Sequence, residues 1–182
     1  MMRVIAGTAR GKNLASLPGE DVTRPTINRV KEAMFSSVQF LVPGARVLDL
    51  FAGSGQLGIE ALSRGAAHAV FVDQSPRSIA VVKENLEITG FSDVSSVVLK
   101  SQMDFLRTTN QRFDFAFLDP PYRKGILEET LPVLSEYMNP DGLVICEMET
   151  ELNLPEKIGR LGLKKSYKYG KIKVVMYSVN NS

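Results

Sequence analysis

The chain has 182 residues, of which 44% are hydrophobic and 23% charged, and its net charge is +2. This length is typical of one domain with its own core, and no apolar run approaches the roughly 20 residues that span a bilayer. A single His and a single Cys provide too few ligands for a His/Cys zinc site and exclude an internal disulfide. We therefore expect a cytoplasmic, monomeric, single-domain protein without a metal and without a membrane partner.

Basic residues gather near both ends of the chain. Residues 1–31 contain six Lys or Arg and only two acidic residues, and residues 157–173 contain seven basic residues and no acidic one. Such a distribution is attractive to a phosphate backbone, although lysines in a solvated surface give the same pattern. The basic residues of the second stretch are Lys157, Arg160, Lys164, Lys165, Lys168, Lys171 and Lys173.

From residue 46 onwards, short apolar runs alternate with amphipathic stretches, which is typical of βα units on a parallel sheet. Strands are predicted at 46–51, 69–74, 95–99, 113–119 and 143–149, with a turn at 139–142. Helices are predicted at 56–65, from Pro76 to about Thr89 and at 126–138. Ser75 and Pro76 suit the first turn of the second helix, and Gly90 suits its end. Pro132 predicts a kink or a late start in the third helix.

The alternation stops after residue 149. A short helix is predicted at 155–162, and residues 163–179 read as two strands that turn at Tyr169-Gly170. The N-terminal 43 residues form an extension with a hairpin-like segment and a helix at 26–40, whose apolar residues recur at helical spacing. The fold class is therefore α/β: a mostly parallel, Rossmann-like sheet with helices on both faces and a C-terminal antiparallel hairpin.

A glycine-rich loop follows the first strand of the alternating region. Gly53 to Gly58 match G-x-G-x-x-G, which permits a tight turn and close approach of backbone amides to a ligand. Asp73 ends the next strand, where a carboxylate accepts hydrogen bonds from ribose hydroxyls. Asp49 lies beside the loop, where a negative charge suits the ammonium and sulfonium of S-adenosylmethionine better than the pyrophosphate of NAD. The three features together favour S-adenosylmethionine.

The segment Asp119-Pro120-Pro121-Tyr122 follows the fourth strand. Two prolines fix two φ angles, so a carboxylate, a proline carbonyl and an aromatic ring are held in one geometry. The carboxylate and the Pro120 carbonyl provide two acceptors for the hydrogens of an exocyclic amine, which would aim its lone pair at a methyl donor. Tyr122 would stack on the base that carries this amine. The segment therefore predicts methylation of an amino group on a planar base.

These motifs resemble those of class I, S-adenosylmethionine-dependent amino-methyltransferases with a [DN]-P-P-[YFW] motif. The stretches RVIAGTARGKNL and RPTINRVKEAMF near the N-terminus are similar to those of the RsmD family, which methylates guanine N2 in bacterial small-subunit (16S) ribosomal RNA. The resemblance covers essentially the whole chain. The D-P-P-Y motif is shared with enzymes that act on adenine, cytosine or glutamine, so it indicates the chemistry and not the substrate.

The resemblance implies roles for individual residues. The adenine contact is open among Ser101, Gln102 and Met103, because relatives often have Asp or Asn where this chain has Ser101. The candidate catalytic residues are Asp119, Pro120, Pro121 and Tyr122. The candidate cofactor residues are Thr26, Asp49, Phe51, Ala52, Gly53, Ser54, Gly55, Asp73, Gln74, Ser101, Gln102 and Met103. The candidate RNA-binding residues are Arg10, Lys12, Arg24 and Arg29. Asp114 and Glu147 are interpreted as charges at strand edges.

The leading hypothesis is an RNA guanine-N2 methyltransferase that acts on 16S ribosomal RNA within a small-subunit particle. One alternative is a DNA adenine-N6 methyltransferase, although 182 residues leave no room for a separate target-recognition domain. Another alternative is a non-catalytic RNA-binding assembly factor, which the intact Gly53, Asp73 and Asp119 disfavour.

Overall fold

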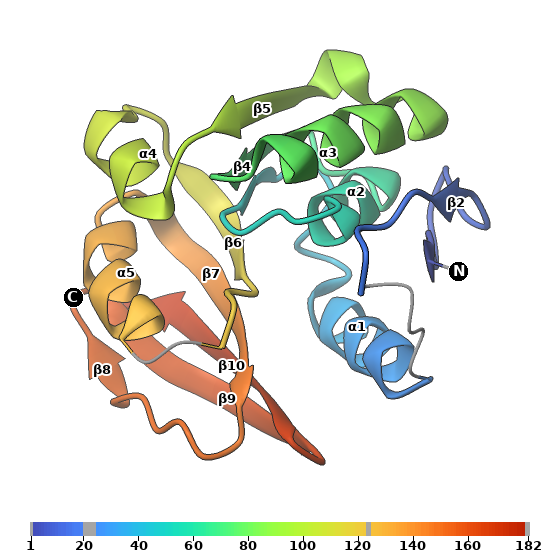
Figure 1. Cartoon of the computed structure of the whole chain (residues 1–182). Helices are drawn as coiled ribbons and strands as arrows, with labels where there is room; N and C mark the ends of the chain where they lie inside the picture. The colour runs from blue at the N-terminus through green and yellow to red at the C-terminus, as the bar shows by residue number, and fades with distance from the viewer. Residues whose placement is uncertain (1, 20–24, 123–124, 181–182) are drawn as a thin grey trace.

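A sheet of eight strands runs through the molecule and separates two layers of helices (Figure 1). The computed structural model describes residues 2–19, 25–122 and 125–180, and the side chains of 25–27 are not among the parts described. The strands in spatial order are β5 (Ser95–Leu99), β4 (His68–Asp73), β3 (Arg46–Asp49), β6 (Phe113–Leu118), β7 (Met138–Glu149), β10 (Ile172–Val179), β9 (Leu161–Tyr169) and β8 (Lys157–Ile158).

The chain order reverses between β3 and β6. Strands β5, β4, β3, β6 and β7 pair in parallel, whereas β10, β9 and β8 continue the sheet antiparallel. From β3 the chain moves outward to β4 and β5, and it then returns to place β6 on the other side of β3. Ligands of such open α/β sheets bind at the carboxyl ends of the strands next to this reversal. The predicted α/β sheet with its C-terminal hairpin is confirmed.

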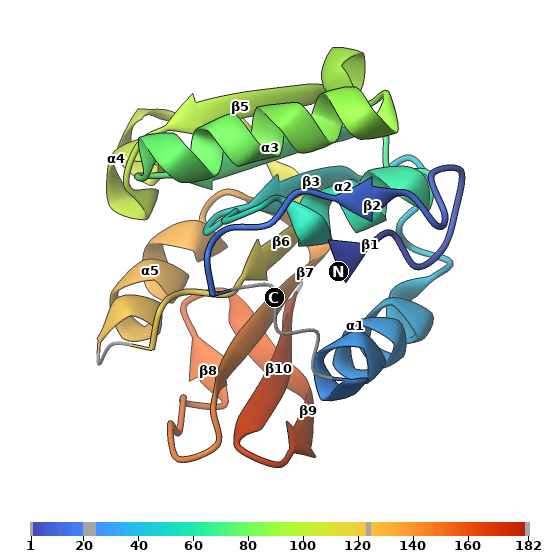
Figure 2. The same cartoon turned by 45° about the vertical axis from the view of Figure 1, so that its right-hand side comes forward.

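Helices cover both faces of the sheet (Figures 1 and 2). Buried residues of α1, α2 and α3 share one core cluster with one face of the sheet, and those of α4 and α5 share a second cluster with the other face. Within the described part of the chain, no helix has the length and apolar character needed to span a membrane. The helices are α1 (Pro25–Val38), α2 (Gln56–Ser63), α3 (Pro76–Thr89), α4 (Gln102–Thr108) and α5 (Ile126–Ser135), with a 3₁₀ turn η1 (Ser92–Val94).

The local sequence explains the ends of α3. The Ser75 hydroxyl accepts a hydrogen bond from the Ser78 amide at 3.3 Å, and Pro76 occupies the first helical position. Gly90 ends the helix with φ +79° and donates its amide to two carbonyls of the last turn. The positive φ favours glycine at this place. The predicted bounds of this helix are therefore confirmed.

The N-terminal segment packs against α2. Its two short strands, β1 (Met2–Arg3) and β2 (Asn13–Leu14), pair antiparallel. The buried Glu60 carboxylate accepts hydrogen bonds from the amides of Ile5 at 2.9 Å and Ala6 at 3.0 Å, and it also binds Arg64 at 2.9 Å. Ser63 Oγ accepts a further bond from the Ala9 amide at 3.0 Å. These side chains of α2 hold the N-terminal segment against the rest of the fold, in addition to the backbone bond from the Thr8 amide to the Ser63 carbonyl at 2.8 Å.

Asn85 of α3 connects the N-terminal segment to the glycine-rich loop. Its side-chain oxygen accepts from the Ala15 amide at 2.7 Å. Its side-chain nitrogen donates to the carbonyls of Ala15 at 2.9 Å and Ser54 at 2.8 Å. Asn85 is fully buried, with an exposed fraction of 0%. One amide therefore satisfies three backbone groups in two separate segments.

Helix α1 packs on the sheet through the face that the sequence predicts. Val30, Met34 and Val38 are buried, and the Phe35 ring lies 5.4 Å from the Phe117 ring of β6. Lys31 is also buried and donates to Gln56 Oε1 of α2 at 3.0 Å. Burial lowers the pKa of Lys31, because a charged ammonium is poorly solvated there. The helix is thus tied to the segment that follows the glycine-rich loop.

Two local predictions are wrong. Residues 155–162 form no helix: β8 and the start of β9 pair there antiparallel around Gly159, whose φ is +56°. Ile158 and Leu161 are buried as register partners, so strand pairing places both apolar side chains in the core. Residues 139–142 form no separate turn, because they are an irregularity within β7. Of the two possibilities at Pro132, the late start does not occur, because Pro132 lies inside α5, which begins at Ile126.

Helix α4 is an element that the sequence analysis missed. It has only seven residues, too few for a clear apolar periodicity. The Ser101 hydroxyl accepts a hydrogen bond from the Asp104 amide at 3.1 Å and so caps its first turn. The spacing of a serine followed three residues later by an acidic residue was the signal available in the sequence. The cap fixes the course of the chain directly after β5.

We predict that Asn85→Ala lowers the free energy of unfolding by about 3 kcal/mol, because it leaves three buried or half-buried backbone groups without their partner. Urea unfolding followed by circular dichroism measures this change. Glu84→Ala, at an exposed position of the same helix, is the matched control and is expected to change stability by less than about 0.5 kcal/mol. A loss below about 1 kcal/mol for Asn85→Ala would mean that water replaces the amide.

Candidate active site

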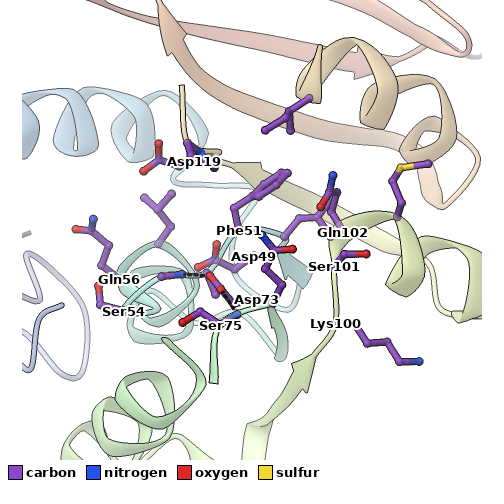
Figure 3. Close-up of a pocket in the computed structure, with 18 of the residues that line it drawn as sticks. Asp49, Phe51, Ser54, Gln56, Asp73, Ser75, Lys100, Ser101, Gln102 and Asp119 are labelled. Carbon is purple, nitrogen blue, oxygen red and sulfur yellow. Dashed lines mark hydrogen bonds between the residues drawn. The ribbon is translucent and has the colours of Figure 1, made fainter. Parts of the chain in front are cut away.

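A cavity of about 520 Å³ opens at the carboxyl ends of the central parallel strands (Figure 3). The loops after β3, β4 and β6 and the start of α4 surround it. It brings together most of the residues that the sequence analysis assigned to a cofactor and two of those assigned to the target amine. The predicted residues that line it are Asp49, Phe51, Ala52, Gly53, Ser54, Asp73, Gln74, Ser101, Gln102, Met103, Asp119 and Pro121.

The three glycines of the loop act in different ways. Gly53 and Gly55 have φ of +56° and +82°, and these values turn the chain sharply before α2 begins. Gly58 lies against Phe71 of β4, where an added Cβ would stand 2.4 Å from the ring. Gly55 does not line the cavity itself. The positive φ of Gly53 and Gly55 gives the tight turn that the motif predicts, and the missing side chain of Gly58 lets α2 pack close to the sheet.

Asp73 holds the glycine-rich loop in place. Its Oδ2 accepts a hydrogen bond from the Gly53 amide at 2.9 Å, and its Oδ1 accepts one from the Ser75 amide at 2.9 Å (dashed lines in Figure 3). Each carboxylate oxygen has two lone pairs, so both can still accept from a ligand hydroxyl. The predicted ribose contact thus fits a carboxylate that is already oriented by backbone amides.

Asp49 is a buried carboxyl group in the wall of the cavity, with an exposed fraction of 1%. Its Oδ2 accepts a hydrogen bond from the Gly58 amide at 3.0 Å. Burial raises the pKa of Asp49 to about 7, the Gly58 amide opposes this rise, and the nearby Asp73 carboxylate adds to it. An ionised Asp49 is therefore costly unless a cation binds beside it. A cationic ligand would lower this pKa.

The D-P-P-Y segment lies directly after β6. Asp119 and Pro121 line the large cavity, and Figure 3 shows Asp119 on the side of it opposite the Asp73 loop. Pro120, Pro121 and Tyr122 line a smaller adjacent cavity. Tyr122 is 55% exposed, which leaves ring surface accessible to solvent. An exposed aromatic ring beside a pocket suits stacking on a planar ligand.

Residues 101–103 close the end of the cavity near β5. Ser101, Gln102 and Met103 all line it. The Ser101 hydroxyl caps α4, so this side chain has a structural task here. The choice of the adenine contact among the three residues stays open at this point.

Several lining residues were not predicted. Gln56 and Leu57 occupy the variable positions of the glycine motif, and Lys100 precedes Ser101. Ile126 and Glu129 come from the first turn of α5. Their spacing of three residues places both on one helix face, and this spacing directly after the D-P-P-Y segment was the available signal. Leu50 and Ser75 also line the cavity.

Three of the four predicted RNA-binding residues lie in the described part of the structure, and none of these three lines the cavity. Arg10 and Lys12 are exposed between β1 and β2, and Arg29 is exposed on α1. Lys12 Nζ donates to the Ile88 carbonyl of α3 at 2.9 Å, so it also has a structural partner. Arg24 and the side chain of Thr26 lie outside the described part of the structure. The predicted contacts of these residues with RNA remain predictions.

The basic run near the C-terminus does not form a uniform surface. Lys164, Lys165 and Lys168 are exposed on β9. Lys173 is buried and its ammonium donates to the Leu152 carbonyl at 2.5 Å. Arg160 donates to the Ser135 carbonyl at 3.4 Å. At least two of the seven basic residues are therefore engaged in packing the chain.

Comparison with known proteins identifies relatives along the whole chain. The model of the family described as Conserved hypothetical protein 95 matches residues 2–178. The Bacillus subtilis protein YlbH is 39% identical, and the match covers 97% of this chain and 98% of YlbH. The Escherichia coli protein named Ribosomal RNA small subunit methyltransferase D is 33% identical over 97% of this chain and 89% of its own length.

A solved structure agrees with these relatives. The structure of yhhF from Escherichia coli matches with a TM-score of 0.86 at 32% identity, and it covers 100% of this chain and 99% of its own. The agreement extends through the N-terminal segment and the C-terminal hairpin, which lie outside the parallel part of the sheet. The resemblance seen in the N-terminal motifs is confirmed: the chain belongs to the RsmD family.

Proposed function

We propose that this protein transfers a methyl group from S-adenosylmethionine to the exocyclic N2 of a guanine in small-subunit ribosomal RNA. One observation carries the proposal: a single cavity is lined both by the glycine-rich loop with its two aspartates and by Asp119 and Pro121 of the amine-binding segment. A methyl donor and an amine must meet within bonding reach, so a shared cavity is what the reaction requires.

The residues of the cavity fit S-adenosylmethionine. A volume of about 520 Å³ is within the usual range for nucleoside-sized ligands. The buried Asp49 carboxyl suits a ligand with cationic groups and Asp73 suits a ribose, whereas a charged Asp49 would repel the pyrophosphate of a dinucleotide. When bound, S-adenosylmethionine supplies a methyl group that is activated by the positive sulfur.

The amine-binding segment prepares the nucleophile. The lone pair of an exocyclic guanine nitrogen is delocalised into the ring, so the nitrogen is a poor nucleophile. Asp119 and the Pro120 carbonyl would accept its two hydrogens, favour a pyramidal nitrogen and direct the lone pair into the cavity. Tyr122 would hold the base by stacking. Asp119 or water would take the proton that the nitrogen loses.

The relatives support ribosomal RNA as the substrate. The Escherichia coli relative is named for the small ribosomal subunit and is matched over nearly the whole chain. The exposed Arg10 and Arg29 and the small size of the chain fit a protein that leaves much of the recognition to an assembled particle in the bacterial cytoplasm. Guanine N2 and the particle are the finer parts of the proposal.

A methyl-transfer assay with labelled S-adenosylmethionine tests the proposed function. The substrates are protein-free 16S RNA, small-subunit particles that lack the modification, and unmethylated duplex DNA, and the product is digested to nucleosides. We expect N2-methylguanosine from RNA or particles. N6-methyladenine from DNA would mean that the protein is instead a DNA adenine-N6 methyltransferase. Transfer to none of the substrates would favour the non-catalytic assembly factor.

We predict that Asp119→Asn keeps measurable methyl transfer, whereas Asp119→Ala loses at least about 100-fold in kcat/KM. The Asn oxygen still accepts a hydrogen bond from the amine, and the Ala methyl group accepts none. Single-turnover rates at saturating S-adenosylmethionine measure both variants, with Asp104→Asn, at an exposed position of α4, as the control. Equal inactivity of Asp119→Asn and Asp119→Ala would instead assign proton acceptance to this carboxylate.

We also predict that the affinity for S-adenosylmethionine rises with pH across the pKa of about 7 at Asp49. A protonated Asp49 must release its proton before it can pair with a cation, so binding weakens as pH falls below 7. Between pH 7.5 and pH 5.5 the dissociation constant should rise about 20-fold. Asp49→Asn should bind weakly and show a flat profile. Titration calorimetry checks this, and an equal pH slope in Asp49→Asn would contradict the role of this group.

A further inference from the structure

Glu147 lies next to Asp119 at the carboxyl edge of the sheet. Strands β6 and β7 pair in parallel with Leu118 opposite Cys146. Asp119 follows directly after the end of β6, and Glu147 follows Cys146 within β7, so each acidic residue lies one position beyond this last pair. Such strands run about 4.8 Å apart. The interpretation of Glu147 as a simple strand-edge charge overlooks this neighbour.

Glu147 shares a cavity with the amine-binding segment. It lines the smaller cavity together with Pro120, Pro121 and Tyr122. It is absent from the lining of the large cavity that the cofactor residues form. Glu147 therefore lies on the side of the amine-binding segment where the target base would enter, and not on the side of the cofactor residues.

The carboxyl group of Glu147 is partly removed from water. The residue is half-buried, and this burial raises its pKa above the usual range of a glutamate. Removing a carboxyl group from water costs free energy unless it is hydrogen-bonded or paired, so most carboxyl groups face solvent. A half-buried carboxyl beside a candidate active site is a signature of residues that bind a substrate.

The chemistry of guanine supplies a partner for this group. The Watson–Crick edge of guanine carries three hydrogens, one on N1 and two on N2. Asp119 and the Pro120 carbonyl account for the two hydrogens on N2, and the N1 hydrogen still needs an acceptor when the base is out of its helix. Adenine has a lone pair on N1, which a carboxylate would repel. A third acceptor beside Asp119 would therefore distinguish the two purines.

We propose that Glu147 accepts a hydrogen bond from N1–H of the target guanine and thereby selects guanine over bases whose N1 is an acceptor. This inference rests on the proposed function, because Glu147 would recognise the base whose amine is methylated at the same site. A site built to bind a donor rejects an analogue that lacks it more strongly than an apolar pocket rejects a change in size.

The test compares guanine with 2-aminopurine at the target position. 2-Aminopurine keeps the exocyclic amine on C2 but has an acceptor at N1. Once the methylated nucleotide is mapped, a synthetic oligonucleotide carrying either base is ligated into the small-subunit RNA, and the RNA is assembled into particles if the enzyme requires them. The wild-type protein should prefer guanine. Glu147→Gln can donate to N1 of 2-aminopurine, so the ratio of kcat/KM for the two bases should fall about 10- to 100-fold.

Two controls separate base selection from a structural role. Glu151→Gln, at an exposed position of the loop after β7, should keep the wild-type ratio. Thermal unfolding of Glu147→Gln should occur at the wild-type temperature or above, because an amide is less costly to bury than a carboxylate. An unchanged ratio, or an equal loss on both bases, would overturn the role of Glu147 and leave the proposed function intact. If the wild-type protein forms no N2-methylguanosine, the proposed function and this inference both fail.

Discussion

The parallel pairing of β3 with β6 is the constraint on which the candidate site depends. Asp49 lies opposite Phe117 in this pairing, so the chain leaves both strands at the same edge, and Asp119 follows two residues after Phe117. Backbone bonds continue past the strand ends, from the Leu50 amide to the Phe117 carbonyl at 3.1 Å and from the Ala52 amide to the Val72 carbonyl at 2.9 Å. The glycine-rich loop and the D-P-P-Y segment are thereby fixed relative to each other by the sheet.

The N-terminal extension is connected to the same loop through side chains. Asn85 binds both Ala15 and the Ser54 carbonyl, and Lys31 of α1 binds Gln56, whose side chain lines the cavity. Under the proposed function, the N-terminal segment that contains Arg10 is therefore connected to the cofactor loop through the side chain of Asn85. Contact with RNA and binding of the cofactor would then act on one connected network of side chains.

The sequence predicted those features of the fold and the candidate site that depend on a local pattern of residues. The glycines with positive φ and the serine cap before Pro76 follow from local sequence, and the structure has them at the predicted positions. Asp119 and Pro121 of the D-P-P-Y segment line the same cavity as the glycine-rich loop. Long-range pairing was less accessible. Residues 155–162 read as a helix because the local pattern does not reveal that Leu161 pairs with Val179 of β10, which brings β9, and the strand β8 paired to it, into the sheet. Glu147 was undervalued because only the register of β6 and β7 places it beside Asp119.

A crystal structure of the protein with S-adenosylhomocysteine would test the central claim most directly, namely that cofactor and target amine share one cavity. The account predicts the amino-acid part of the ligand beside Asp49, its ribose on Asp73 and its sulfur facing Asp119. The adenine ring would then identify its contact among residues 101–103. A ligand bound outside this cavity, or a sulfur separated from Asp119 by protein atoms, would contradict the account.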